Sequence, residues 1–305
     1  MFLLLNTLLT GITAGAIYSL MALSMVIIWR STRVINFAQA GQALLSTYVG
    51  YEVVSKIGNY WIALPIAILA GAIVAALIEI CVMRFLLKLN QSGSMGPIGE
   101  VAPIIVTLGL LGLVRATIAF IWGGQDVTIK APLSNVGYSI GDQTLVFSPM
   151  KLMIIISVLI LLAALGILFQ KTTLGLQLKA AAFSPEISKL SGVRVDRVRT
   201  IGWALSGAVG AVAGLLQTAN GSGAISPEAI EFALLLVAGF ISAVIGGLDS
   251  LVGAVVGGLV LGVLVSIVLT YIDGGLFFIA PLVILVLILI IRPAGLFAQK
   301  AGRRA

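Results

Sequence analysis

Long apolar runs alternate with short polar segments along almost the whole chain. Several runs reach the roughly 20 residues that a helix needs to cross the hydrocarbon core of a bilayer. The first run has no basic start and no small-residue cleavage site, so we expect it to be retained as a helix. The pattern predicts nine membrane-spanning segments, at about 2–28, 37–55, 60–83, 104–122, 152–169, 200–219, 231–246, 251–271 and 276–291.

Three of these segments allow a second interpretation. Residues 37–55 begin with the polar sequence FAQAGQALLSTYVGY, which fits a re-entrant or pore-lining segment as well as a full span. The runs 231–246 and 251–271 are separated only by the short turn GGLDS. A bundle of eight spans with one re-entrant segment therefore stays open beside a bundle of nine.

The composition indicates a polytopic membrane protein built of helices. Sixty per cent of the residues are hydrophobic, 10% are charged, and the mean hydropathy is +1.19. A soluble domain carries about 25% charged residues, which is what a water-facing surface needs. The 35 glycines fit helices whose backbones approach one another closely. We expect a single all-α transmembrane bundle over residues 1–305, in contact with the lipid bilayer of the cell membrane.

The sequence offers little for catalysis or metal binding. It has no histidine and one cysteine, Cys81, which lies in an apolar run. Zinc, haem and iron–sulfur sites, disulfides and Cys–His catalysis are therefore not expected. No acidic cluster inside a span supplies a general base, and no GxxxxGK[ST] loop would hold a nucleotide. We predict no catalytic residue, no metal ligand and no enzyme activity.

The placement of lysine and arginine predicts the orientation in the membrane. Fourteen of the 18 basic residues lie in one set of connections, against three (Lys56, Lys130 and Lys151) in the opposite set. Because cytoplasmic loops carry the excess of positive charge, the first set is predicted to be cytoplasmic. Nine alternating spans then put the N-terminus outside and the C-terminus inside. Since the basic residues flank apolar runs, the net charge of +7 does not indicate a nucleic-acid partner.

The polar segment 170–199 interrupts the second half of the chain and is predicted to be cytoplasmic. Within it, Ser184 is a good N-cap and Pro185 suits the first helical position. Glu186 would face the positive end of the helix dipole, and Gly192 is placed to end the helix. These residues predict a helix of about two turns.

The predicted short helix allows two interpretations. Ile187 and Leu190 fall three residues apart on one face, and basic residues including Arg194 flank the helix. A rigid helix with exposed apolar side chains suits docking to a partner protein. The other interpretation is an ordinary cytoplasmic loop that contains a helical turn.

Polar side chains within the spans are the other candidates for function. Asn36, Gln39 and Gln42 recur at helical spacing, and polar amides in a membrane face the protein interior or a wet cavity. They either line a solute path or form hydrogen bonds between helices. Arg115 inside the fourth span either contacts solute, pairs with a carboxylate such as Glu52, or extends towards the membrane surface.

Further polar and small residues are expected to be structural. Glu79, near the inner end of the third span, should pair with Arg84 or reach the surface. Asp249 is a plausible N-cap for the eighth span. The glycines of the sixth and eighth spans fit close helix packing.

Six motifs follow one another along nearly the whole chain: GITAGAIYSLMALSMVIIW, RVINFAQAGQALLSTYVGY, VTLGLLGLVR, LGLQLKAAAFSPEISKLSGVRVDRV, IGGLDSLVGAVVGGLVLG and RPAGLF. In this order they resemble motifs of the permease subunits of ATP-binding-cassette importers of the branched-chain amino acid (leucine, isoleucine, valine) type. Each motif alone is weakly specific, whereas the ordered set is strongly so.

The resemblance implies a path for branched-chain or related amino acids, or for urea or amides, opened by alternating access. It also implies that residues 185–191 are the coupling helix, seated in a cleft of a cytoplasmic ATPase. The implied partners are a second homologous permease, ATP-binding subunits and an extracellular or periplasmic solute-binding protein. The partner subunits would bind ATP, so this chain would hold no cofactor.

Two departures from the family pattern fall in the second segment. Gln39 stands where many relatives have a histidine, and STY at 46–48 replaces GAY. These differences concern the identity of the solute more than the class of transporter. The alternative is an ion-gradient-driven secondary transporter of a small polar solute, which would favour carboxylates at mid-depth and paired inverted repeats.

Overall fold

The computed structural model describes the chain except for residues 92–95, 97–98, 100, 141–142, 293–294 and 298–305. Its helices are α1 (Phe2–Thr32), α2 (Gln39–Ile57), α3 (Tyr60–Ile78), the π-helical η1 (Glu79–Met83), α4 (Arg84–Gln91), α5 (Ala102–Trp122), α6 (Pro149–Lys171), α7 (Thr173–Phe183), α8 (Pro185–Leu190), α9 (Val195–Asn220), α10 (Ile230–Gly246), α11 (Leu251–Tyr271), the 3-10 helix η3 (Gly274–Phe277) and α12 (Ala280–Ile291). Its short strands are β1 (Val127–Thr128), β2 (Tyr138–Ile140), β3 (Gln143–Leu145) and β4 (Ala224–Ile225).

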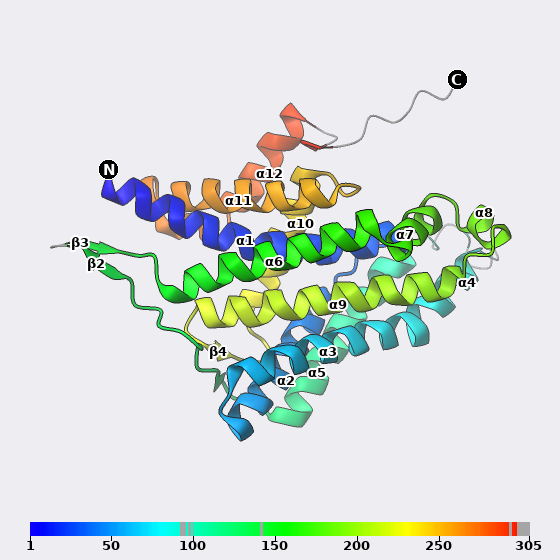
Figure 1. The fold of residues 1–305 in the computed structure, drawn as a ribbon, viewed down its shortest axis with the longest axis horizontal. Helices are drawn as coiled ribbons and strands as arrows, with labels where there is room; N and C mark the ends of the chain where they lie inside the picture. Colours follow the sequence, from blue (N-terminus) through cyan, green and yellow to red (C-terminus); the bar gives the residue numbers. More distant parts are fainter. Residues whose placement is uncertain (92–95, 97–98, 100, 141–142, 293–294, 298–305) are drawn as a thin grey trace.

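The long helices run side by side and form a bundle with two distinct ends (Figure 1). The N-terminus and the β2–β3 pair lie at one end, and α8 lies at the other. Helices α1 and α9 are central, because α1 packs on α9, α10 and α11 while α9 also packs on α2 and α3. Helices α1 and α9 therefore connect the two ends of the bundle.

All nine predicted spans are helical, as the apolar pattern indicates. Within the described residues, six helices are long and apolar enough to cross a membrane: α1, α3 continued through η1 and α4, α5, α6, α9 and α11. Helices α10 and α12 are shorter apolar helices, and α2 is the polar one that the sequence analysis singled out. The predicted all-α membrane bundle is confirmed.

Some boundaries differ from those predicted. Helix α9 starts at Val195 rather than near 200, because Val195 and Val198 are buried and extend its apolar contacts inward. Helix α7 also lies within the segment expected to be a loop, so 170–199 is mostly helical. The motif RPAGLF includes residues 293–294, which lie outside the described part of the chain.

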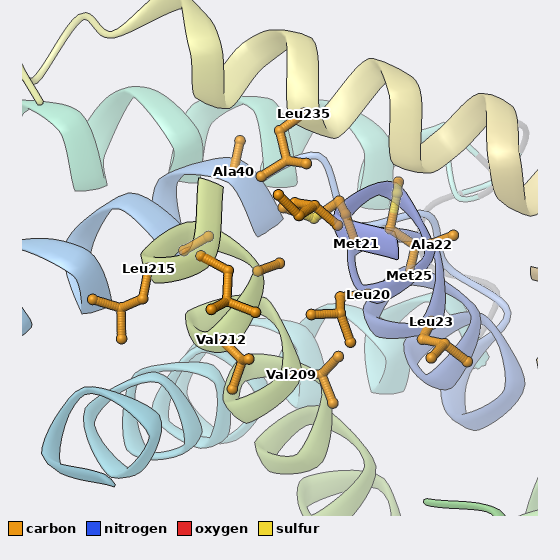
Figure 2. Packing of buried hydrophobic residues seen from close by; sticks show 14 of the residues in the cluster. Leu20, Met21, Ala22, Leu23, Met25, Ala40, Val209, Val212, Leu215 and Leu235 are labelled. Atoms are coloured by element: carbon orange, nitrogen blue, oxygen red, sulfur yellow. The ribbon is translucent and has the colours of Figure 1, made fainter. Parts of the chain in front are cut away.

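The core is formed by apolar side chains from most of the long helices, with the largest contributions from α1 and α9. Figure 2 shows Leu20 and Met21 of α1 facing Val209 and Val212 of α9, with Leu235 of α10 and other residues nearby. Burial of such side chains cannot drive association of helices in lipid as it does in water, so close packing has to hold the bundle together.

Glycines allow that close packing where helices cross. A side-chain carbon at Gly207 of α9 would collide with the backbone of Gly71 on α3. One at Gly258 of α11 would collide with Ser19 on α1, whose hydroxyl instead donates to the carbonyl of Val255 at 2.8 Å. The structural interpretation of the glycines is confirmed at these crossings.

The strands tie loops together at the end of the bundle opposite α8. Strand β1, which follows α5, pairs antiparallel with β4, which follows α9. The sequence TLVF at 144–147 contributes to β3, which pairs with β2 in a hairpin. These contacts fix the loop after α9 relative to the loop after α5.

Candidate functional site

The short helix α8 begins as its sequence predicts. The backbone N–H of Ile187 donates to the side-chain oxygen of Ser184 at 3.4 Å, which makes Ser184 the N-cap. Pro185 occupies the first helical position, where a backbone N–H would have no helical partner. Glu186 lies in the first turn, where a carboxylate interacts favourably with the helix dipole.

The end of α8 is equally well defined. Gly192 has a φ of 82°, the left-handed conformation that glycine adopts at little cost. Its N–H donates to the carbonyl of Lys189 at 3.0 Å, and the N–H of Val193 donates to Ser188 at 2.9 Å. Together these bonds form a Schellman motif, which satisfies carbonyls that the helix leaves free. Both ends of this six-residue helix are therefore fixed by hydrogen bonds.

Helix α8 exposes most of its apolar surface. Ile187 is 63% exposed and Leu190 89% exposed, and Phe183 at the end of α7 is 91% exposed. Ser188 is buried, on the side where α8 contacts α7 and α9. Arg194 is exposed just before α9 begins. This end of the bundle thus presents apolar side chains beside a positive charge, on a fixed backbone.

Two of the three predicted polar residues of the second segment form a buried network. The side chain of Asn36 donates to Gln39 Oε1 at 3.1 Å, and Gln39 donates to the carbonyl of Ser206 on α9 at 3.1 Å. The Ser206 hydroxyl contacts the carbonyl of Ser24 on α1 at 2.8 Å and Gln39 Oε1 at 3.2 Å. Asn36 and Gln39 are fully buried. These bonds link α1, α2 and α9, which is the geometry of the interhelical alternative, and a lining of the solute path by Asn36 and Gln39 stays a prediction.

Gln42 and Arg115 differ from that pair. Gln42 is buried, and both polar atoms of its amide are without a hydrogen-bond partner among the described residues. Arg115 is half-buried on α5, and its Nε has no partner in the same set. The alternative that Arg115 pairs with Glu52 is wrong, since Glu52 instead contacts Lys56 at 2.8 Å and accepts from Trp122 at 2.9 Å.

A buried ion pair lies near the start of α9. The fully buried carboxylate of Glu79 accepts from Arg84 at 2.9 Å, as predicted, and from the Thr200 hydroxyl at 2.7 Å. Arg84 also donates to Thr200 at 2.7 Å. The cluster therefore holds η1 and α4 against the first turns of α9, directly after the segment that contains α8.

Asp249 has a different role from the predicted one. The N-cap of α11 is Ser250, whose hydroxyl accepts from the N–H of Gly253 at 2.9 Å. Asp249 instead accepts from Arg33 at 2.7 Å. The N-cap position falls one residue after Asp249, so the exposed Asp249 carboxylate can pair with Arg33 at the end of α1.

The molecule is a helical membrane bundle with the exposed, capped helix α8 at one end and buried amides in its core. The profile of a family described as "Branched-chain amino acid transport system / permease component" matches residues 7–291. The chain belongs to this family. The permease is thus a multi-pass membrane protein with a role in transport rather than catalysis, as the sequence resemblance implied.

Named relatives agree over nearly the full length. The permease is 28% identical over 285 residues to the probable branched-chain amino acid transport permease protein LivH of Methanocaldococcus jannaschii. The aligned region covers 91% of this chain and 87% of that protein. It is 24% identical to the high-affinity branched-chain amino acid transport system permease protein LivH of Escherichia coli K12, over 97% and 96% of the two chains. It is also 22% identical to the fructose import permease protein FruF of Bifidobacterium longum, over 88% and 71%. No solved structure matches the permease.

Sequence reasoning missed the hydroxyl partners of the predicted residues. Thr200 and Ser206 complete the two buried networks, and both lie on α9. The signal that points to them is a hydroxyl residue inside a glycine-rich apolar span, because such a side chain has to find a partner away from lipid. The sequence does not reveal which partner that is.

Proposed function

We propose that the permease forms part of the solute path of an ATP-driven importer, together with a second homologous permease. Helix α8 docks onto cytoplasmic ATP-binding subunits, which hold the ATP, and an extracellular or periplasmic solute-binding protein delivers the solute. The solute is a branched-chain or related amino acid. In this arrangement the N-terminus faces outside and the C-terminus, whose last residues lie outside the described part of the chain, faces the cytoplasm.

The exposed face of α8 supports the coupling role. Fully burying a leucine or isoleucine side chain contributes about 1.5–3 kcal/mol, so Ile187 and Leu190 offer a partner several kcal/mol of favourable contact. The caps at both ends, through Ser184 and Gly192, keep the backbone rigid, so movement of a docked partner would be passed on rather than absorbed. The route onward is α9, which begins at Val195 and runs the length of the bundle (Figure 1).

The relatives support the solute class. Those named above as branched-chain amino acid permeases align over nearly the whole chain, including the segment with α8. Within the membrane, Gln42 and Arg115 have hydrogen-bonding capacity that the described residues leave unused. We assign them to the solute path, where a zwitterion would supply the missing partners, and leave Asn36 and Gln39 with a mainly structural role.

Purification of the permease from its native membrane tests the assembly. An ATPase and a second permease should copurify with it. A chain that comes out alone and moves solute in liposomes without ATP would instead be a secondary transporter, and the proposal would fail.

Substitutions on α8 test the coupling. The double variant Ile187→Ser/Leu190→Ser should lower both transport and transport-stimulated ATP hydrolysis while membrane insertion is kept. Gly192→Val should act in the same direction, because valine is strained at a φ of 82°. Val136→Ser is the matched control, since Val136 is 76% exposed but lies in the loop region at the opposite end. Normal transport in both α8 variants would refute the docking role.

A further inference from the structure

Two adjoining cavities lie at the end of α9 that is remote from α8. The larger, of about 310 Å³, and the smaller, of about 130 Å³, share Gln217 of α9 and Glu231 of α10 in their linings. The 22 residue steps from Val195 to Gln217 span roughly 33 Å at the rise of an α-helix. In the proposed orientation the cavities therefore face the outside, where solute is delivered.

The smaller cavity is polar and contains an unused hydroxyl. It is lined by Thr218 and Ser222 as well as by the two shared residues. Thr218 is only 5% exposed, and its Oγ1 has no hydrogen-bond partner among the described residues. A buried hydroxyl without a partner costs about 1–3 kcal/mol, so this position favours a ligand that supplies an acceptor.

Glu231 is the single charged residue among those that line the two cavities. Its carboxylate makes no hydrogen bond or ion pair with the part of the chain that the structure describes. It lies in the first turn of α10, where it also suits the helix dipole. Glu231 is exposed and lines both cavities, so its carboxylate is accessible to a positively charged group that enters them.

The larger cavity has mostly apolar walls. Its volume is at the lower end of the roughly 300–1,000 Å³ that small-molecule sites occupy. One polar group in this wall, the Tyr18 hydroxyl, comes from α1. The apolar part of the lining consists of Ile230, Leu234, Leu235, Phe277 and Phe278.

We propose that these paired cavities form a binding site at the outer mouth of the path for an amino acid with an apolar side chain, an inference that rests on the proposed function. The ammonium group of the amino acid bonds to the Glu231 carboxylate through a charge-assisted hydrogen bond. Its carboxylate accepts from the Thr218 hydroxyl in the smaller cavity. Its side chain occupies the larger, apolar cavity.

The test is ATP-driven leucine uptake by the complete complex in proteoliposomes, with saturating, leucine-loaded binding protein. Glu231→Gln should lower the initial rate about tenfold, because a hydrogen bond to a charged group contributes about that much to binding. Glu231→Asp should restore part of the rate. Glu228→Gln is the matched control, since Glu228 is an exposed carboxylate three residues earlier that lines neither cavity, and it should leave the rate unchanged.

A purely structural role for Glu231 predicts a different result. If Glu231 were purely structural, both Glu231→Gln and Glu231→Asp would lower the thermal unfolding midpoint together with the rate of leucine uptake. The proposed binding site instead predicts an unchanged midpoint. If Glu231→Gln does not assemble, Leu234→Phe, which fills the apolar cavity and leaves the carboxylate in place, should slow uptake of leucine.

The outcomes separate this site from the proposed function. No ATP-driven leucine uptake by the wild-type complex would refute the proposed function itself. Normal wild-type uptake with equal rates in Glu231→Gln, Leu234→Phe and Glu228→Gln would overturn the site alone.

Discussion

Removal of Arg84 should destabilise the permease far more than removal of the whole ion pair to which it belongs. The Glu79 carboxylate is fully buried, while the Arg84 side chain is 27% exposed. The substitution Arg84→Leu would leave Glu79 with the Thr200 hydroxyl as its remaining hydrogen-bond partner. The carboxylate between α3 and α9 would then lose its direct ion-pair partner, and the buried Arg199 of α9 would be the remaining positive charge that interacts with it.

The expected magnitude follows from the cost of burying a charge. Removing one partner of a buried ion pair costs about 3–5 kcal/mol, and the partial exposure of Arg84 favours the lower end, about 3 kcal/mol. Replacing both charges by apolar residues of similar size is often neutral or stabilising. The double variant Glu79→Leu/Arg84→Leu should therefore unfold within about 1 kcal/mol of the wild type, apart from the loss of the Thr200 bond.

The assay is denaturant unfolding of the wild type, both single variants and the double variant in mixed micelles. The four unfolding free energies form a double-mutant cycle, which isolates the coupling between the two side chains. An Arg84→Leu variant that is as stable as the double variant would refute the reasoning, because it would mean that Glu79 does not need Arg84 as a direct ion-pair partner.

Three further predictions use the same unfolding assay, and the second also uses leucine transport. Gly207→Ala should cost about 1–3 kcal/mol because its new carbon meets the α3 backbone, whereas Gly112→Ala, with open space around it, should be neutral or slightly stabilising. Equal effects would contradict the packing argument. Gln39→Leu should cost about 1–3 kcal/mol by leaving buried partners unsatisfied, while Gln42→Leu should not destabilise the fold but should slow leucine transport. Arg33→Ala should change stability by less than about 1 kcal/mol, since its ion pair is exposed, and a larger loss would contradict that.

Local structure could be predicted closely wherever neighbouring residues decide it. The start and end of α8 follow from Ser184, Pro185 and Gly192, because capping and the left-handed glycine involve groups only a few residues apart. The nine helical segments follow from runs of apolar residues for a similar reason. A backbone in lipid has to satisfy its own hydrogen bonds, so an apolar run of sufficient length forms a helix.

Partners that are distant in sequence could not be predicted. The sequence around Gln39 fits two roles, and its hydrogen bond to the carbonyl of Ser206 depends on a residue 167 positions further along the chain. Asp249 was expected to act within its own turn but pairs with Arg33, 216 residues earlier. In both cases the side chain had a plausible local role, and only the crossing of helices selected the distant one.

The sequence by itself determined the membrane environment, the helical class, the resemblance to a transport family and the form of the short helix α8. These follow from composition, from apolar length and from contacts within one or two helical turns. The tertiary structure alone decided which polar groups are satisfied and which are left over. That outcome depends on how α1, α2, α9 and α10 cross, because a buried side chain such as Gln42 or Thr218 has a free hydrogen-bonding group only when its neighbours in space offer no partner.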